Sequence, residues 1–189
     1  MTTKPLILVK HSLPEVLEGV PAREWNLSED GRARAQELAG KLKVYQPEIV
    51  VSSVEPKARE TAQILSENLG LEFHVVDGLH EHDRRKSPYY SKDDFQDLVR
   101  GFFERPAMLV FGNETANQAL ERFRLAVDTV LSSYEGKTIA IVAHGTVISL
   151  FVSWLTGCDG YQLWKNLGPP SFVVVDVQSK LLLKVENLP

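Results

Sequence analysis

Residues 6–14 read LILVKHSLP, an apolar run followed by the polar residues Lys10, His11 and Ser12. Four apolar residues stand between two prolines, which indicates a short buried strand rather than a helix. Lys10, His11 and Ser12 follow where such a strand leaves the core. Because ligands of open α/β sheets bind just beyond the carboxyl ends of the strands, these three side chains are placed where chemistry can occur.

Strand and helix patterns alternate along the rest of the chain. Apolar runs predict strands within 47–53, 71–78 and 137–145, and a hairpin at 171–185. Capping residues and apolar spacing predict helices at 27–43, 55–70, 93–105, 114–136 and 146–157. Residues 80–92 have no period and are expected to form a surface loop. The alternation predicts an α/β fold: a three-layer sandwich with a mostly parallel central sheet and helices on both faces, built from one domain spanning 1–189.

The composition narrows the class of protein. Hydrophobic residues make up 43% of the 189 residues, which is enough for a substantial core. The net charge of −4 comes without a basic stripe, which argues against nucleic-acid binding but allows a local cationic pocket for a small anion. Cys158, the only cysteine, cannot form an internal disulfide. Because no segment is long and apolar enough for a signal peptide or a membrane span, we expect a cytoplasmic protein without membrane contact.

Two histidines share the same sequence context. His11 follows the run LILVK, and His144 follows the run IAIVA and precedes Gly145. If the two strands are parallel neighbours in one sheet, their carboxyl ends lie on the same edge and the imidazoles can meet. The alternative, in which each histidine is an ordinary polar residue at a strand end, stays open at this point.

A third strand end adds hydroxyl groups and a cation. Residues 50–62 read VVSSVEPKARETA, in which the strand closes with two serines and a helix then begins with backbone amides available to an anion. Lys57 and Thr61 lie four residues apart on one face of that helix, whereas Arg59 points away by roughly 160°. We therefore expect Lys57 in a pocket and Arg59 on the surface.

Together these segments resemble the histidine phosphatase superfamily, which has the phosphoglycerate mutase-like fold. The family's Arg-His-Gly triplet resembles Lys10-His11-Ser12, and its L-T-x-x-G-x-x-Q-A pattern resembles LSEDGRARAQ at 27–36. Its S-S-x-L-x-R-A-x-x-T-A pattern resembles SSVEPKARETA at 52–62. Three shorter matches are the Leu-x-Glu at 79–81, the Gly-Glu-Ser pattern near 112–123, and the His-Gly pair at 144–145. The matches span roughly residues 5–175 in the family's order.

The resemblance implies a role for each matching residue. His11 takes the place of the nucleophile that accepts the phosphoryl group as a phosphohistidine. His144 takes the place of the second pocket histidine, which donates to the phosphoryl oxygens. Glu81 takes the place of the general acid and base, and apolar or anionic surroundings would raise its pKa toward the working range. Gly145 and Thr146 begin a helix whose backbone amides are expected to help hold the phosphate.

The departures from the family pattern concern the same site. Lys10 and Lys57 stand where the family has arginines, so the charge is kept while the planar fork that grips two oxygens is lost. Ser12 replaces a glycine beside the nucleophile, and its hydroxyl either contacts the phosphate or narrows the pocket. Two replacements of one kind favour a coordinated variant with retained phosphoryl chemistry over an inactive phosphate-binding relative, and both interpretations keep an anion pocket.

The loop after Glu81 has two interpretations. Arg84, Arg85 and Tyr89 either form a solvated loop or a rim that recognises the part of the substrate beyond the phosphate. Glu114 either helps to cap the following helix or forms part of the pocket wall.

The neighbours of Glu81 also suggest a metal site. His80 and His82 flank this glutamate, but the resembling family works without a metal, so we expect none.

We therefore predict a metal-independent phosphatase, without cofactors, that hydrolyses a small phosphomonoester through a phosphohistidine on His11. A phosphoglycerate mutase-type phosphotransferase is the nearest alternative, although the short chain shows little inserted material for an enclosing lid. Two further alternatives are a non-catalytic domain that binds phosphorylated ligands and a metal-dependent hydrolase. The physiological substrate and the oligomeric state, including a homodimer, are left open.

Overall fold

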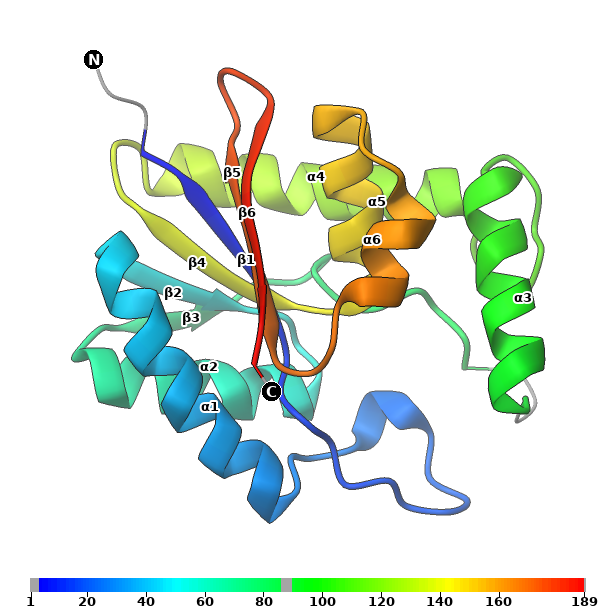
Figure 1. The fold of residues 1–189 in the computed structure, drawn as a ribbon, viewed down its shortest axis with the longest axis horizontal. Coiled ribbons are helices and arrows are strands. Elements are labelled where there is room, and N and C mark those ends of the chain that lie inside the picture. Colours follow the sequence, from blue (N-terminus) through cyan, green and yellow to red (C-terminus); the bar gives the residue numbers. More distant parts are fainter. Residues whose placement is uncertain (1–3, 86–89, 189) are drawn as a thin grey trace.

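A computed structural model of the chain describes residues 4–85 and 90–188 (Figure 1). Its strands are β1 Leu6–Lys10, β2 Ile49–Ser52, β3 Phe73–Val75, β4 Ile139–Ala143, β5 Ser171–Asp176 and β6 Leu181–Asn187. Its α-helices are α1 Glu29–Leu42, α2 Pro56–Leu69, α3 Lys92–Glu104, α4 Ala116–Ser133, α5 Gly145–Thr156 and α6 Gly160–Asn166. Two short 3-10 helices are η1 Ala22–Glu24 and η2 Lys43–Tyr45.

The six strands form one sheet in the order β3-β2-β4-β1-β5-β6. The first four strands of that order are parallel, β5 is antiparallel to β1, and β6 is antiparallel to β5. The runs of β1 and β4 are continuously apolar because both faces of these central strands are covered. Lys10 pairs with Ala143 in the register of the two strands, so His11 and His144 leave the sheet at adjacent positions.

Helices cover both faces of the sheet, as Figure 1 shows: α1 and α2 lie on one side, and α4 and α5 on the other. Side chains of α1 and α2 pack with Ile7 and Val9 of β1, while those of α4 and α5 pack with Leu6 and Leu8. This alternation follows from the period of two in a strand. The three-layer α/β sandwich with a mostly parallel sheet is therefore confirmed.

Local signals explain where several helices begin and end. Ser28 caps α1 by accepting the N–H of Gly31, and Thr115 forms a capping box with Gln118 at the start of α4. Gly70 ends α2 with a positive φ of 68°, a conformation that glycine adopts without strain. No helix among the described residues is long and apolar enough to span a membrane.

Two elements differ from the sequence predictions. The third strand is only three residues long, because the chain turns at Asp77, whose carboxylate accepts the N–H of Gly78. The short helix α6 was not predicted; Asp159 caps it by accepting the N–H of Gln162. Its seven residues span about two turns, too short to show a clear apolar period.

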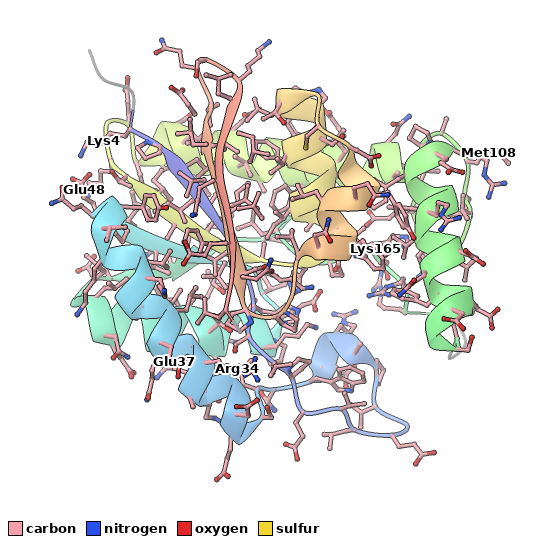
Figure 2. All side chains as sticks on the ribbon, in the orientation of Figure 1. Lys4, Arg34, Glu37, Glu48, Met108 and Lys165 are labelled. Carbon is pink, nitrogen blue, oxygen red and sulfur yellow. The ribbon has the colours of Figure 1, made fainter. Side chains whose placement is uncertain are left out.

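An exposed ion pair links the residues just before β1 and β2. Lys4 donates to Glu48 over 2.7 Å, and Figure 2 shows the two labelled side chains side by side at the edge farthest from Met108. Glu48 also accepts the N–H of Thr138, just before β4. These contacts lie at the amino ends of the strands, opposite the ends that carry the histidines.

Candidate active site

The two strand-end histidines meet beyond the carboxyl edge of the sheet. The ring centroids of His11 and His144 lie 5.1 Å apart, with the ring planes tilted by 60°. Both side chains are buried. The prediction that the parallel strands bring the two imidazoles together is confirmed, because β1 and β4 are neighbours in register.

His11 is held with a defined tautomer. Its Nδ1–H donates to the carbonyl of Ser12 over 2.7 Å, which leaves the lone pair on Nε2. Burial, the neighbouring His144 and the charge of Lys57 keep the pKa of His11 well below its usual value. The ring is therefore neutral near pH 7, and Nε2 can act as a nucleophile.

A hydrogen-bond chain fixes the backbone next to His11. The N–H of Ser12 donates to the hydroxyl of Thr61 over 3.0 Å, and this hydroxyl donates to the carbonyl of Lys57. Thr61 and Lys57 are both buried, while Arg59 is exposed, as the helical spacing predicted. The hydroxyl of Ser12 is buried and has no hydrogen-bond partner among the described residues.

His144 lies on the N-terminal side of α5 and is fully buried. Its Nε2 lies 2.9 Å from the hydroxyl of Ser53, while Nδ1 has no hydrogen-bond partner in the described part of the chain. Burial and the charge of Lys57 lower the pKa of His144 well below its usual value. A buried polar nitrogen without a partner costs free energy unless a ligand or water completes it.

Lys10 and Gly145 lie against each other at the ends of β1 and β4. The Nζ of Lys10 donates to the carbonyl of Leu167 over 2.5 Å. A Cβ atom at position 145 would come within 3.2 Å of the Cε of Lys10, so glycine leaves room for the lysine stem. Burial lowers the pKa of Lys10, and the charge of Glu81 partly offsets this effect.

Lys57 is engaged in a buried ion pair with Glu55. The Nζ of Lys57 lies 2.6 Å from Oε2 of Glu55 and also donates to the carbonyl of Ala22 over 2.7 Å. Glu55 lies just before α2 at the edge of the sheet, and its Oε2 lies 3.8 Å from Nδ1 of His144. The cation that the sequence placed in the pocket is therefore accompanied by a carboxylate.

Glu81 faces the same group of residues from the loop after β3. Its carboxylate accepts the N–H of His82 over 2.8 Å and that of Thr146 over 3.3 Å. Burial by itself raises the pKa of Glu81. Interactions with His144, with the charge of Arg84 and with the His82 N–H lower it by a larger amount, so the resulting pKa is about 2. The net shift is opposite to the upward shift expected from the sequence, because cationic and hydrogen-bonding groups surround this carboxylate.

Residues 6–182 match the model of the histidine phosphatase superfamily (branch 1). The chain belongs to the histidine phosphatase superfamily. The uncharacterized phosphatase PhoE of Bacillus subtilis (strain 168) is 26% identical over 133 residues, which are 70% of this chain and 66% of PhoE. The chain thus spans slightly less than two thirds of this relative's length.

Solved structures of two phosphatases share the fold. A mycobacterial glucosyl-3-phosphoglycerate phosphatase superposes with a TM-score of 0.72 and 22% identity, covering 92% of this chain and 90% of that one. A phosphoserine phosphatase from Entamoeba histolytica, in complex with 3-phosphoglyceric acid, gives a TM-score of 0.76 and 21% identity, covering 97% of each chain. The similarity extends over nearly the whole sheet and its helices, and it establishes the phosphoglycerate mutase-like fold.

The sequence analysis missed Glu55 and Arg122. The superfamily pattern has leucine where this chain has Glu55, so an acidic residue at an apolar position was the available signal. Arg122 donates to the carbonyls of Gly78, His80 and Glu81 from α4. No local pattern marks Arg122, because these three carbonyls lie about forty residues away along the chain.

Glu114 supports the loop that carries Glu81. Its carboxylate lies 2.6 Å from Arg122 and also accepts the N–H of Asp83. Thr115 rather than Glu114 provides the cap of α4. The other carboxylate oxygen, Oε2, accepts the Nε–H of Arg122 over 3.3 Å, so both oxygens of Glu114 contact groups of the protein and this residue braces the loop.

The remaining rim residues lie beside that brace. Arg84 is half-buried, and its guanidinium lies 4.8 Å from the centre of the Phe95 ring. Arg85 is exposed and pairs with Asp83 through a forked contact. Tyr89, which was predicted for the rim, lies outside the described residues. Arg84 is the rim cation whose charge reaches Glu81.

The histidines beside Glu81 do not converge on a common point. The ring of His82 lies 4.2 Å from that of Phe102 and 4.6 Å from that of Phe111, and its Nε2 is 3.2 Å from the Glu114 carbonyl. His80 instead faces Asp77 at 3.7 Å. Across residues 4–85 and 90–188, no group of three or more histidine, cysteine, aspartate or glutamate side chains is arranged to hold a metal ion.

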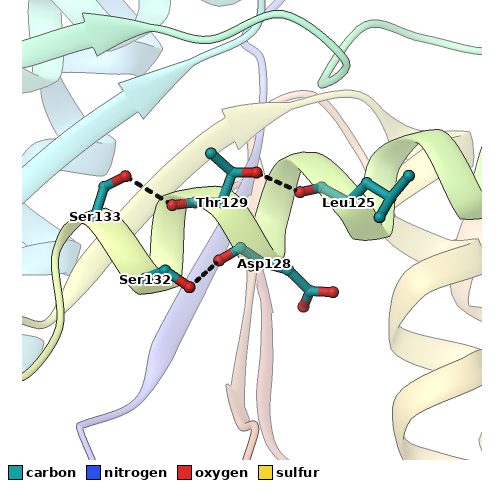
Figure 3. A pocket seen from close by; sticks show the side chains of 5 residues that line it. All are labelled: Leu125, Asp128, Thr129, Ser132 and Ser133. Atoms are coloured by element: carbon teal, nitrogen blue, oxygen red, sulfur yellow. Dashed lines mark hydrogen bonds between the residues drawn. The ribbon is translucent and has the colours of Figure 1, made fainter.

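A shallow depression of about 440 Å³ lies on the outer face of α4 and is lined by none of these residues. Figure 3 shows that the hydroxyls of Thr129, Ser132 and Ser133 donate to carbonyls one turn earlier in the same helix. These hydroxyls are already bonded within the helix, so the depression offers a ligand little beyond the helix surface.

Proposed function

We propose that this protein is a phosphatase that hydrolyses a small phosphomonoester through a phosphohistidine on His11. One observation carries the proposal: the Nδ1–H of His11 donates to Ser12 while its ring faces His144 across 5.1 Å. This arrangement leaves a neutral Nε2 as the nucleophile and a second imidazole beside it. The superfamily membership and the phosphatase relatives support the same reaction class.

In the first step, Nε2 of His11 attacks phosphorus and forms a P–N bond while the bond to the leaving oxygen breaks. Glu81 gives its proton to that oxygen. We assign the proton of His144 to Nδ1, with the Ser53 hydroxyl donating to Nε2. This N–H and the hydroxyl of Ser12, neither of which has a partner among the described residues, then donate to the phosphoryl oxygens, where negative charge develops. Lys10 and Lys57 provide the positive charge around the phosphoryl group.

In the second step, water attacks phosphorus and its proton goes to the carboxylate of Glu81. The P–N bond breaks, its electron pair returns to Nε2 of His11, and inorganic phosphate leaves. No metal ion takes part in either step, so chelators leave the rate unchanged. The half-buried Arg84 contacts the part of the substrate beyond the phosphate.

The proton for the first step must be acquired when the substrate binds. With a pKa of about 2, Glu81 is ionised at neutral pH in the structure described here. A phosphate dianion placed beside it raises its pKa, because two like charges disfavour ionisation. Substrate binding is therefore coupled to the uptake of a proton by Glu81.

The test is hydrolysis of p-nitrophenyl phosphate in the presence of EDTA by the wild type and by His11→Ala. His74→Ala is the matched control, because His74 is an exposed histidine stacked on Tyr134 outside the site. We expect activity that resists EDTA, is lost in His11→Ala and is kept in His74→Ala. Activity that survives in His11→Ala, or that EDTA abolishes, overturns the proposed mechanism.

A further inference from the structure

Glu55 places a negative charge inside the proposed phosphate pocket. Its side chain is only 8% exposed, and that of Lys57 only 6%. One carboxylate oxygen contacts Lys57 at 2.6 Å, and the other accepts the backbone N–H of Glu81 at 2.9 Å. The first oxygen also lies 3.8 Å from Nδ1 of His144. Glu55 therefore contacts a pocket cation and the backbone of the proposed general acid, and it lies close to a pocket histidine.

The two lysines of the site are equalled in number by two carboxylates, while Arg84 adds a cation at the rim. The pKa values of His11 and His144 are lowered, mainly by burial, so both rings are neutral near pH 7. Two lysines, Lys10 and Lys57, are then matched by two carboxylates, those of Glu55 and Glu81.

We propose that the carboxylate of Glu55 offsets the attraction of the Lys57 ammonium for the phosphoryl group. The site therefore binds inorganic phosphate weakly and releases it readily. This inference rests on the proposed function, because it assigns the pocket to a phosphoryl group. The reason is electrostatic: a carboxylate in direct contact with a buried ammonium offsets much of the attraction that this cation exerts on a nearby anion. At the same time, the contact with the Glu81 N–H positions the general acid.

The first test compares Glu55→Gln with Glu60→Gln. The amide of Glu55→Gln still has an oxygen for the Glu81 N–H but no longer has a charge for Lys57. Glu60 is a matched control because its carboxylate also bridges a cation, Arg32 at 2.6 Å, and a backbone N–H, that of Leu27 at 2.8 Å. We expect Glu55→Gln to bind inorganic phosphate about tenfold more tightly by isothermal titration calorimetry, with Glu60→Gln unchanged.

A second set of variants tests the interaction between Glu55 and Lys57 by removing the charge of Lys57. Lys57→Met leaves Glu55 unpaired in the pocket and is expected to weaken phosphate binding about 100-fold. Adding Glu55→Gln to Lys57→Met removes that charge and should recover at least tenfold of the loss. Circular dichroism and thermal unfolding show which variants are folded, and the double variant serves where a single variant does not fold.

The results separate this inference from the proposed function. Phosphate binding is measured without turnover. If the protein binds phosphate but does not hydrolyse p-nitrophenyl phosphate, the proposed phosphatase activity is contradicted, while the effect of Glu55→Gln on phosphate affinity still tests the role of Glu55. If the wild type shows no binding, binding that appears in Glu55→Gln supports the inference and binding in neither protein overturns it. Equal or weaker binding by Glu55→Gln, or no recovery in the double variant, also overturns it.

Discussion

The two lysines near His11, Lys10 and Lys57, have different surroundings. Lys10 donates to a backbone carbonyl, that of Leu167, and forms no ion pair with the described residues. Lys57 contacts the carboxylate of Glu55 and the carbonyl of Ala22. Both are lysines in one pocket, yet only the charge of Lys57 is offset by an adjacent carboxylate. The comparison shows that two lysines near the same histidine differ in the charge they offer to a ligand, because their neighbours differ.

Removing the charge of Lys10 should have the largest effect on activity. Lys10→Met is expected to lower kcat/KM about 1000-fold, because it removes the cation whose charge is not offset by direct contact with a carboxylate. Lys57→Met should lower it about 100-fold. The measurement is steady-state hydrolysis of p-nitrophenyl phosphate at neutral pH. A larger loss in Lys57→Met than in Lys10→Met would contradict the difference between the two lysines.

Stability should rank the two substitutions in the opposite order. Lys57→Met leaves the buried carboxylate of Glu55 without its partner and should lower the free energy of unfolding by about 3 kcal/mol. Lys10→Met leaves no unpaired charge in direct contact and should change it by less than about 1 kcal/mol. Urea unfolding followed by circular dichroism measures both values. Equal losses would show that the Glu55–Lys57 pair is no more important for folding than Lys10.

The position of Lys10 can be changed without removing its charge. In Gly145→Ala the new methyl group meets the Lys10 side chain at 3.2–3.5 Å, so the ammonium must shift, and kcat/KM should fall about tenfold. Gly40→Ala is the control, because this exposed position in α1 has no heavy atom within 4 Å of the added group. If both alanine variants keep wild-type activity, the close contact between Lys10 and Gly145 has no role in catalysis.

The smallest predicted effect is the change in the free energy of unfolding per pH unit. Because burial lowers the pKa of His144 in the folded state, the unfolded chain binds a proton below pH 6.5 that the folded chain does not. The free energy of unfolding should therefore decrease on acidification below pH 6.5, by up to about 1.4 kcal/mol per pH unit for this histidine. His11 has the same direction of shift. Urea unfolding between pH 7 and 5 gives the free energy of unfolding as a function of pH, and this dependence should be shallower in His144→Ala than in the wild type. An unchanged dependence would contradict a lowered pKa of His144 in the folded state.

The order of elements and the meeting of two histidines could be predicted because both depend on local signals. Continuous apolar runs mark β1 and β4 as strands covered on both faces, and parallel neighbours bring their carboxyl ends to one edge. The helical spacing also placed Lys57 inside and Arg59 outside. The short α6 lacked enough turns to give a period.

The sequence by itself determined the layered α/β fold, through residue order and apolar periodicity, and it carries the motifs whose resemblance to the superfamily makes His11 the candidate nucleophile. Only the tertiary structure decided how the charges pair. Glu55 meets Lys57, the Glu81 backbone and His144, groups that come from α2, a loop and a strand end. The pKa of a carboxylate depends on such neighbours at a few ångströms, and this dependence reversed the expected shift of Glu81. Residue identity supplies the charges, and their spatial arrangement determines how they act.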